Sequence, residues 1–250
     1  MDLTREVKQR VLNEEMDQVG ITSADSLKDA PEGRRPTDIL PTASSVIVAA
    51  VHVLDSVYDL PYTRYEYTNQ FFILNSMLNS MAFKVSRYLE SEGYRALPIP
   101  AAYPRVNKEI FGILSHRHAA VQAGLGEMAL NNLLTTPQFG SRIRLVSIVT
   151  EAPLEADPPF EENLCLEKRT ECELACVRNC PVQAISEDGM IDKAKCLHYQ
   201  EQIMPWSAVE LRCGVCVASC PIGERTWKIP AGSRSQRVTE MKEVWTGAQW

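Results

Sequence analysis

Apolar and polar positions follow a helical period at the start of the chain. In residues 3–18, Val7, Val11 and Met16 recur at the spacing of one helix face, with charged residues between them. Gly20 follows directly, and a glycine there is typical of a helix end. The pattern predicts an amphipathic helix that is capped by Gly20.

Two further helical patterns lie deeper in the first half of the chain. Residues 69–92 carry a broad apolar stripe that stops at Gly93. Residues 109–122 repeat the helical spacing and are followed by Gly124. We expect a helix at each place, ended by its glycine.

Short apolar runs rich in β-branched residues separate these helices. They cover residues 45–53, 94–99 and 142–150, and such runs predict buried strands. Strands that alternate with helices indicate an α/β module. We expect its sheet to be mixed rather than purely parallel.

The cysteines mark a second module. Residues 1–164 contain none, and all eight lie within residues 165–220. They are Cys165, Cys172, Cys176, Cys180, Cys196, Cys213, Cys216 and Cys220. Residues 151–163 are rich in proline and acid and are expected to form a linker. The predicted division is a first domain at 1–157, a cysteine domain at 158–227 and a C-terminal tail at 228–250.

The cysteine spacing is typical of ligands to iron–sulfur clusters. The run Cys213-x2-Cys216-x3-Cys220-Pro221 fits the two-cluster ferredoxin pattern, in which the cysteine before proline ligates the other cluster. The first run departs from it, because six residues separate Cys165 from Cys172, and three separate Cys172 from Cys176, where two are usual. The crossing pattern predicts two sets of four ligands. The first is Cys165, Cys172, Cys176 and Cys220, and the second is Cys180, Cys196, Cys213 and Cys216.

Zinc and disulfides are the alternatives for these cysteines. Zinc sites usually pair two C-x2-C knuckles, and only one C-x2-C pair is present. Disulfides are typical of oxidising compartments. The N-terminus has no apolar signal-peptide core, so we expect a cytoplasmic protein with reduced or metal-bound thiols. Two [4Fe–4S] clusters are the favoured reading.

The bulk composition argues against two classes of partner. The formal net charge is −6, which is not the basic footprint of a nucleic-acid-binding protein. The longest apolar run, residues 45–54, is far shorter than the roughly 20 residues of a membrane helix. We therefore expect neither a nucleic-acid nor a membrane partner.

Residues 118–160 resemble the corrinoid-dependent iron–sulfur reductases, the group that contains epoxyqueuosine reductases and reductive dehalogenases. The most specific parts are Ala123-Gly-Leu-Gly126, Asn131 to Leu134, and Pro137-x-Phe-Gly-Ser141 leading into Arg144-Leu145. The first helix, the GYRALPI strand and the cysteine module come in the same order as in that group. The resemblance covers most of the chain.

The resemblance implies a nitroreductase-like first module that binds a corrinoid (cobalamin), followed by an α+β ferredoxin-like module with two [4Fe–4S] clusters. It implies electron transfer to a base-off corrinoid and reductive cleavage of a small-molecule substrate, with ferredoxin or flavodoxin as electron donor. A homodimer is a further expectation. The residues implied to line the corrinoid are Asn131, Thr135, Gly140, Ser141 and Arg142.

Some positions differ from that group. Ala129-Leu130 replace a Gly-Lys or Gly-Arg pair before the asparagine. Epoxyqueuosine reductases carry an acidic proton donor in this region, and Glu109 is the sole acid in residues 100–118. Dehalogenases use a tyrosine as proton donor. The catalytic candidate is therefore Tyr103, with Arg105 nearby. The helical repeats that bind tRNA in epoxyqueuosine reductases have no counterpart in this sequence, so we do not expect a tRNA substrate.

Three other functions stay open at this point. The chain could be an electron carrier, or a reductant and escort for the corrinoid of another protein. Flavin could occupy the first module instead of a corrinoid. Residues 124–129 also match the dinucleotide fingerprint G-x-G-x-x-A, but a helical pattern precedes them where a strand is required, which favours a helix C-cap.

Overall fold

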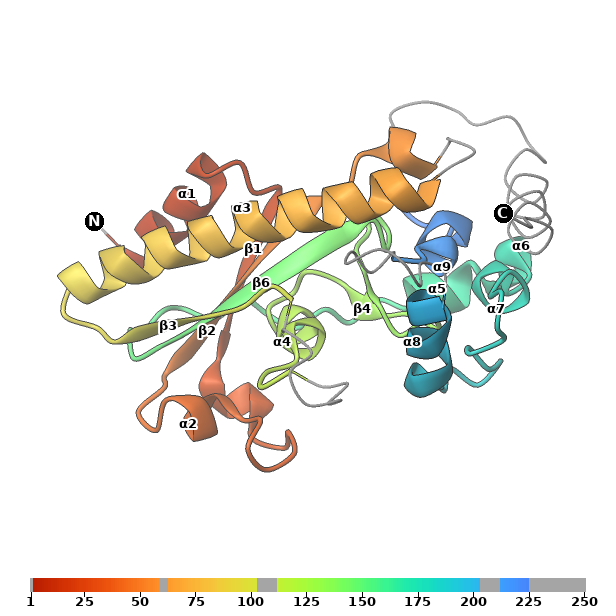
Figure 1. The fold of residues 1–250 in the computed structure, drawn as a ribbon. Coiled ribbons are helices and arrows are strands. Elements are labelled where there is room, and N and C mark those ends of the chain that lie inside the picture. The colour runs from red at the N-terminus through yellow and green to blue at the C-terminus, as the bar shows by residue number, and fades with distance from the viewer. Residues whose placement is uncertain (1, 59–62, 103–111, 203–211, 225–250) are drawn as a thin grey trace. The chain divides into compact units, whose positions relative to one another are not determined.

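The computed structural model describes residues 2–58, 63–102, 112–202 and 212–224. Figure 1 shows the elements in chain order. The strands are β1 (Gln18–Ser23), β2 (Ser45–His52), β3 (Ala96–Ile99), β4 (Glu127–Met128), β5 (Leu134–Thr135) and β6 (Ile143–Thr150). The helices are α1 (Leu3–Asn13), α2 (Pro36–Ile39), α3 (Thr63–Ser91), α4 (His116–Gln122), α5 (Leu164–Glu167), α6 (Arg169–Cys172), α7 (Ala175–Arg178), α8 (Lys193–Gln202) and α9 (Val215–Ser219). The 3₁₀ turns are η1 (Ala24–Leu27) and η2 (Asp55–Tyr58).

The chain packs as two compact units, each assembled from separate segments. The sheet unit consists of Met1–His52, Ile73–Glu127 and Ile143–Glu162. The cysteine unit consists of Val53–Phe72, Met128–Arg142 and Asn163–Trp250. The predicted domains are each one continuous stretch, with a boundary at 157/158. In the structure, the internal segments Val53–Phe72 and Met128–Arg142 belong to the same unit as the cysteines.

The sheet unit is built on four strands in the order β1-β2-β6-β3. Every neighbouring pair is antiparallel, with Ile47 opposite Ile148 in the central pair. The expectation of a mixed sheet is therefore wrong for the described residues. Since β2 and β3 are both antiparallel to β6, they run parallel to each other, but β6 lies between them. The helix expected at residues 69–92 is present as α3, which connects β2 to β3 in the chain.

Helices cover both faces of this sheet. On β6, Arg144 hydrogen-bonds Asn75 of α3, and Ser147 hydrogen-bonds His116 of α4. Residues three apart on a strand point to opposite faces, so α3 and α4 pack on opposite sides. The side chains of β2 from Ser45 to Val51 are accordingly all buried. Figure 1 shows α1 beside α3.

The first helix ends earlier than its apolar pattern indicates. α1 stops at Asn13, and Glu15 adopts a left-handed φ of 63°. Gly20, the predicted cap, instead lies in β1 opposite Val48. An added Cβ at Gly20 would lie 2.2 Å from the Ala123 carbonyl oxygen. The glycine is required by a close strand-to-helix approach, which periodicity alone does not reveal.

The predicted linker at 151–163 is largely fixed to the sheet unit. The Asp157 carboxylate accepts hydrogen bonds from the Ile21 N–H and from Lys8, and the Phe160 N–H donates to Val121. Gly124, with a φ of 75°, is approached from the same segment by the Pro158 oxygen. This segment packs along β1 and α4, so its prolines and acids mark an irregular packed chain and not a free connection.

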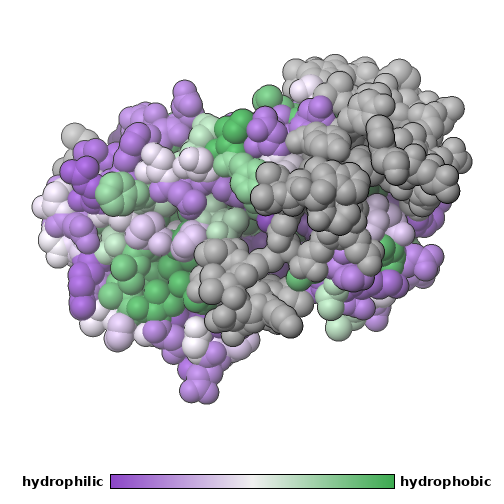
Figure 2. All heavy atoms as spheres, in the orientation of Figure 1, coloured by the Kyte–Doolittle hydropathy of each residue, from purple (hydrophilic) through white to green (hydrophobic). Residues whose placement is uncertain are grey.

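The described surface mixes hydrophilic and hydrophobic areas (Figure 2). Large apolar side chains with substantial exposure include Leu54, Phe83, Leu166 and Met190. Among the helices that the structure describes, none combines the length and hydrophobicity needed to cross a membrane.

Candidate metal centre

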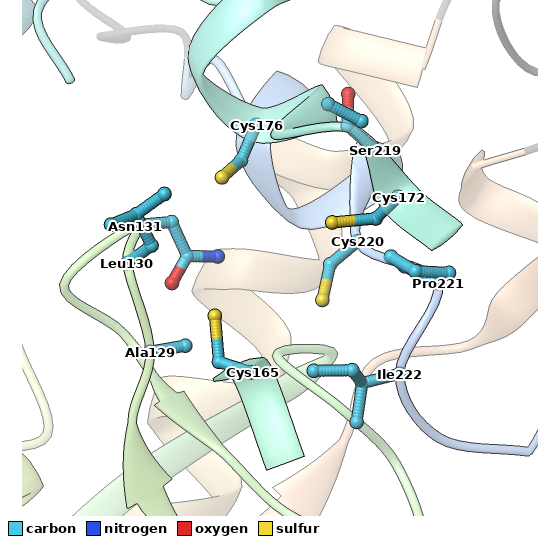
Figure 3. A pocket seen from close by; sticks show the side chains of 11 residues that line it. Ala129, Leu130, Asn131, Cys165, Cys172, Cys176, Ser219, Cys220, Pro221 and Ile222 are labelled. Carbon is cyan, nitrogen blue, oxygen red and sulfur yellow. The ribbon is translucent and has the colours of Figure 1, made fainter. Parts of the chain in front are cut away.

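Four thiols from three separate helices and from the residue after a fourth helix line one pocket in the cysteine unit. Cys165 lies on α5, Cys172 ends α6, Cys176 lies on α7 and Cys220 follows α9. Figure 3 shows their sulfur atoms directed into the same space, together with the Asn131 amide. These are the four cysteines that the crossing pattern predicts for the first cluster; their role as ligands stays a prediction.

Within the described residues, no three His, Cys, Asp or Glu side chains gather tightly enough to hold a single metal ion. The four thiols instead surround a shared volume. A zinc ion would hold each sulfur at about 2.3 Å. A cubane cluster presents its four irons to thiolates spread around a larger body. A pocket lined by four thiols, without a tight single-ion site among the described residues, is compatible with a cubane.

Electrostatic interactions link the cysteines within each predicted group, and Cys176 of the first group also acts on Cys216 of the second. The pKa of the Cys176 thiol is raised to about 11, first by burial and then by nearby thiols, which are Cys220, Cys165 and Cys172. The pKa of the Cys216 thiol is raised well above its ordinary value, again first by burial and then by thiols, which are Cys213, Cys196, Cys176 and Cys180. Both thiols are therefore protonated at neutral pH without a metal, and metal binding must displace those protons.

The irregular spacing of the first run has a local explanation. Between α6 and α7, Glu173 and Leu174 both adopt left-handed backbone conformations, with φ of 48° and 56°. Two such residues in succession reverse the chain sharply. The reversal lets Cys172 and Cys176 face one pocket although three residues separate them. This departure from the usual spacing is therefore compatible with the predicted set.

The second group lies around a small apolar core. Cys180, Ala184 and Ile185 are buried there, with Cys196 and Cys216 packed against them. The Ala184 N–H donates to the Cys180 sulfur at 3.2 Å. The expected turn after this segment is present, as an antiparallel bridge between Ile185 and Ile191 and a φ of 86° at Gly189. Backbone N–H donors of this kind stabilise a thiolate.

Three of the residues implied to line a corrinoid form one buried polar network. The Asn131 amide donates to the Ser141 hydroxyl at 3.1 Å, and the hydroxyls of Thr135 and Ser141 are 2.7 Å apart. All three side chains are buried. Burial raises the pKa of the Cys220 thiol, while hydrogen bonds from the Ile222 N–H and the Ser141 hydroxyl lower it. The network therefore reaches the first group of thiols.

Gly140 and Arg142 serve the packing of the chain after Cys220. Gly140 has a φ of 58°, and an added Cβ would lie 2.0 Å from the Ile222 carbonyl oxygen. Arg142 is fully buried, and its guanidinium donates to Asp55 and to the carbonyls of Ile222 and Glu224. The guanidinium of Arg142 thus bonds to Asp55 and to the chain after Cys220, and its implied role in corrinoid binding stays a prediction.

The catalytic candidates Tyr103 and Arg105, and Glu109, lie outside the described residues. Near them in sequence, His116 is held between the Ser147 hydroxyl at 2.8 Å and the Pro100 carbonyl at 3.0 Å. Burial lowers the pKa of His116 to about 4.

Sequence reasoning missed Asp55. A carboxylate after a strand carries no signal of its own, and its role follows only from the buried guanidinium that it pairs. The dinucleotide fingerprint is not supported by the structure, since Gly124 directly follows α4 and its N–H bonds back to Val121. That is the helix C-cap alternative.

No family model matches this chain. Similar curated proteins include an epoxyqueuosine reductase of Bacillus subtilis, 30% identical over 122 residues that span 45% of this chain and 30% of that protein. A tetrachloroethene reductive dehalogenase of Sulfurospirillum multivorans is 34% identical over 116 residues, or 41% of this chain and 22% of that protein. An epoxyqueuosine reductase of Bacillus cereus is 25% identical over 86% of this chain and 57% of its own length. The chain thus spans between about a quarter and somewhat over half of these relatives.

Solved structures show the same fold. A selenomethionine-labelled epoxyqueuosine reductase matches with a TM-score of 0.65 and 23% identity, over 88% of this chain and 65% of that one. A reductive dehalogenase described in connection with B12-dependent dehalogenation matches with a TM-score of 0.62 and 20% identity, over 96% of this chain and 34% of that one. An epoxyqueuosine reductase solved with a tRNA stem loop matches with a TM-score of 0.65 and 20% identity, over 93% and 68%. The predicted resemblance to these two kinds of reductase is confirmed.

Proposed function

We propose that this chain is an iron–sulfur oxidoreductase that works with two [4Fe–4S] clusters and a corrinoid. The observation that carries the proposal is the convergence of the predicted first ligand set on one pocket. The named relatives are reductases, which supports the same class of activity. When bound, the clusters would supply single electrons and the corrinoid a cobalt centre for reductive cleavage.

The residues of the cysteine unit fit the clusters in donor type and in number. Cys165, Cys172, Cys176 and Cys220 would hold the first cluster, and Cys180, Cys196, Cys213 and Cys216 the second. None of the eight cysteines, all of which lie within the described residues, forms a disulfide, so each can serve as a metal ligand. We assign the sheet unit to a nitroreductase-like fold and the cysteine unit to a ferredoxin-like fold. Free thiols fit a reducing compartment, so we expect a cytoplasmic location.

We propose fewer side-chain contacts to a corrinoid than the resemblance implies. Asn131, Thr135 and Ser141 offer amide and hydroxyl groups beside the first thiol group, and such groups suit the polar rim of a macrocycle. Ala129 and Leu130 line the thiol pocket with apolar surface. These residues would position the ligand and exclude water near Cys220. A corrinoid contact from the Arg142 side chain is not part of the proposal.

The substrate is proposed by class only. The dehalogenase relative favours reductive cleavage of a small organic molecule. A solved epoxyqueuosine reductase with a tRNA stem loop weakens the expectation against nucleic acid, so a modified tRNA belongs among the tested substrates. A small redox protein such as ferredoxin or flavodoxin is the expected electron donor.

The deciding experiment is anaerobic reconstitution with iron and sulfide, followed by iron analysis and EPR after addition of cob(II)alamin. We expect about eight irons per chain, which is the content of two cubane clusters, and a base-off cobalt(II) spectrum. Cys172→Ser and Cys196→Ser should each lose about half of the iron, because each removes a ligand from a different cluster. Ser219→Ala is the matched control, since Ser219 lines the pocket without a thiol and should keep the full iron content.

Two outcomes would redirect the proposal. Full iron content with a cobalt spectrum unchanged from free cobalamin indicates an electron carrier without its own corrinoid. A yellow chromophore in the purified protein indicates flavin in the first module. Iron content near one metal ion per chain contradicts the cluster assignment altogether.

A further inference from the structure

A fully buried arginine braces the segment that follows Cys220. Arg142 has no solvent exposure, and its Nε donates to the Asp55 carboxylate at 2.7 Å. The two other guanidinium nitrogens donate to the carbonyls of Ile222 at 3.1 Å and Glu224 at 2.5 Å. Asp55 is itself buried, with 2% of its side chain exposed. One guanidinium therefore ties η2 to the chain directly after the Cys220-Pro221 pair.

The backbone at Gly140 also packs directly against the backbone at Gly223, in the segment that Arg142 holds. Gly140 and Gly223 both have positive φ, at 58° and 88°. A Cβ on Gly223 would lie 2.3 Å from the Gly140 nitrogen, and one on Gly140 would lie 2.0 Å from the Ile222 oxygen. The Glu224 N–H also donates to the Gln138 carbonyl at 2.8 Å. The two glycines let the backbones touch, and the arginine then fixes their register.

A buried ion pair is costly to maintain unless it is well satisfied by hydrogen bonds. Here Arg142 also donates to two carbonyls of the loop beside a predicted ligand, and a guanidinium stays charged in proteins. Reduction adds negative charge to a cluster, and a nearby positive charge in a low-dielectric site stabilises that state. Asp55 partly offsets the field of Arg142.

We propose that Arg142, held by Asp55, positions the Cys220 thiolate and raises the reduction potential of the first cluster, and that it is not a corrinoid contact. The inference rests on the proposed function only as far as the first cluster exists. It assigns two positioning residues to that cluster and none to the second one.

The pair gives variants whose effects have opposite sign. Arg142→Gln removes the positive charge and should lower the potential of the first cluster. Asp55→Asn leaves Arg142 without its counter-charge and should raise it. We expect each change to alter the reduction equilibrium by about tenfold, which equals 59 mV for one electron. Arg142→Lys keeps the charge but not the three-acceptor geometry, so the potential should fall less than in Arg142→Gln.

The measurement is a potentiometric EPR titration of the anaerobically reconstituted full chain. The second cluster, held by Cys180, Cys196, Cys213 and Cys216, is the internal reference and should keep its potential. Base-off cobalt binding, measured in the same samples, should persist in Arg142→Gln, because the side chain is directed toward Asp55 and the Cys220 loop.

The outcomes separate this inference from the proposed function. Wild-type protein that binds no clusters refutes the proposed function. Wild-type protein with both clusters, but with first-cluster shifts of the same sign in Arg142→Gln and Asp55→Asn, or with equal shifts in both clusters, overturns the inference alone. If Arg142→Gln does not fold, the Asp55→Asn and Arg142→Lys variants decide. A raised potential of the first cluster in Asp55→Asn and a slightly lowered one in Arg142→Lys support the inference. Unchanged potentials in both variants overturn it.

Discussion

The two compact units bury different kinds of side chain. The sheet unit buries aliphatic residues on both faces of its strands, such as Val46, Val48 and Ile148. The cysteine unit buries thiols, a polar network and the ion pair of Arg142 with Asp55. Apolar packing is the main stabilisation of the first kind of interior. The second contains groups that are costly to bury without partners.

The two units also differ in how much long, regular secondary structure they contain. The sheet unit has a four-stranded ladder, with eight paired residues between β2 and β6. In the cysteine unit, α5, α6 and α7 have four residues each and α9 has five. Helices this short are not stable by themselves. The comparison indicates that the sheet unit folds by packing, whereas the cysteine unit depends on what its thiols bind.

Removal of iron should give the largest difference in stability between the two units. A chelator under anaerobic, reducing conditions should abolish slow amide exchange around Cys180 and Ile185, because structural metals contribute on the order of 10 kcal/mol to comparable small modules. Slow exchange in β2 and β6 should remain. Hydrogen exchange read by mass spectrometry on the same sample measures both regions. Equal loss of protection in β2 and β6 would show that the sheet unit also depends on the metal.

A cavity in the core of the sheet unit is expected to lower the stability of that unit without changing the iron content of the cysteine unit. Ile148 is 1% exposed and lies opposite Ile47 in the central strand pair. Ile148→Ala should lower the free energy of unfolding by about 2–5 kcal/mol, and the control Ile148→Val by about 0.5–1.5 kcal/mol. Denaturant titration gives the energies, and the iron content of the folded protein should not change. Loss of iron in folded Ile148→Ala would contradict the independence of the units.

The same contrast explains what could be predicted from the sequence. β2 and β6 were placed within one residue, and the ends of α3 and α4 at Gly93 and Gly124, because local periodicity and caps determine them. The pocket also brings together Cys165, Cys172, Cys176 and Cys220, which spacing and the proline rule had grouped, while the ligand roles of all eight cysteines stay a prediction. Features that depend on distant partners were missed.

Gly20 and Asp55 illustrate those misses. Gly20 was expected to cap a helix, but the carbonyl of Ala123 at 2.2 Å from its potential Cβ requires a glycine in β1. Asp55 was not singled out, but its buried carboxylate accepts from Arg142, 87 residues away in sequence. Neither partner is visible in a local pattern, and both contacts are decided by tertiary packing.

A pH titration gives the smallest and most local test of the sheet unit. Burial lowers the pKa of His116 from 6.5 to about 4. The neutral ring accepts from the Ser147 hydroxyl and donates to the Pro100 carbonyl, which requires the proton on Nε2. As the pH falls below 6.5, the unfolded chain binds a proton that the folded chain does not bind until about pH 4. Stability should therefore fall through this window and be independent of this group above it.

The slope attributable to His116 is at most about 1.4 kcal/mol per pH unit. His116→Gln removes the titrating ring, so the difference between wild type and variant in the free energy of unfolding should shrink steadily from pH 6.5 to about 4. Denaturant midpoints at constant iron content measure it. A constant difference across the window would show that the ring titrates alike in both states. Exchange read separately in β6 should follow the titration, since Ser147 is the strand residue that His116 holds. A response confined to the hairpin at Ile185 and Ile191 would instead place the acid sensitivity in the cysteine unit, where the protonation of thiols opposes metal binding.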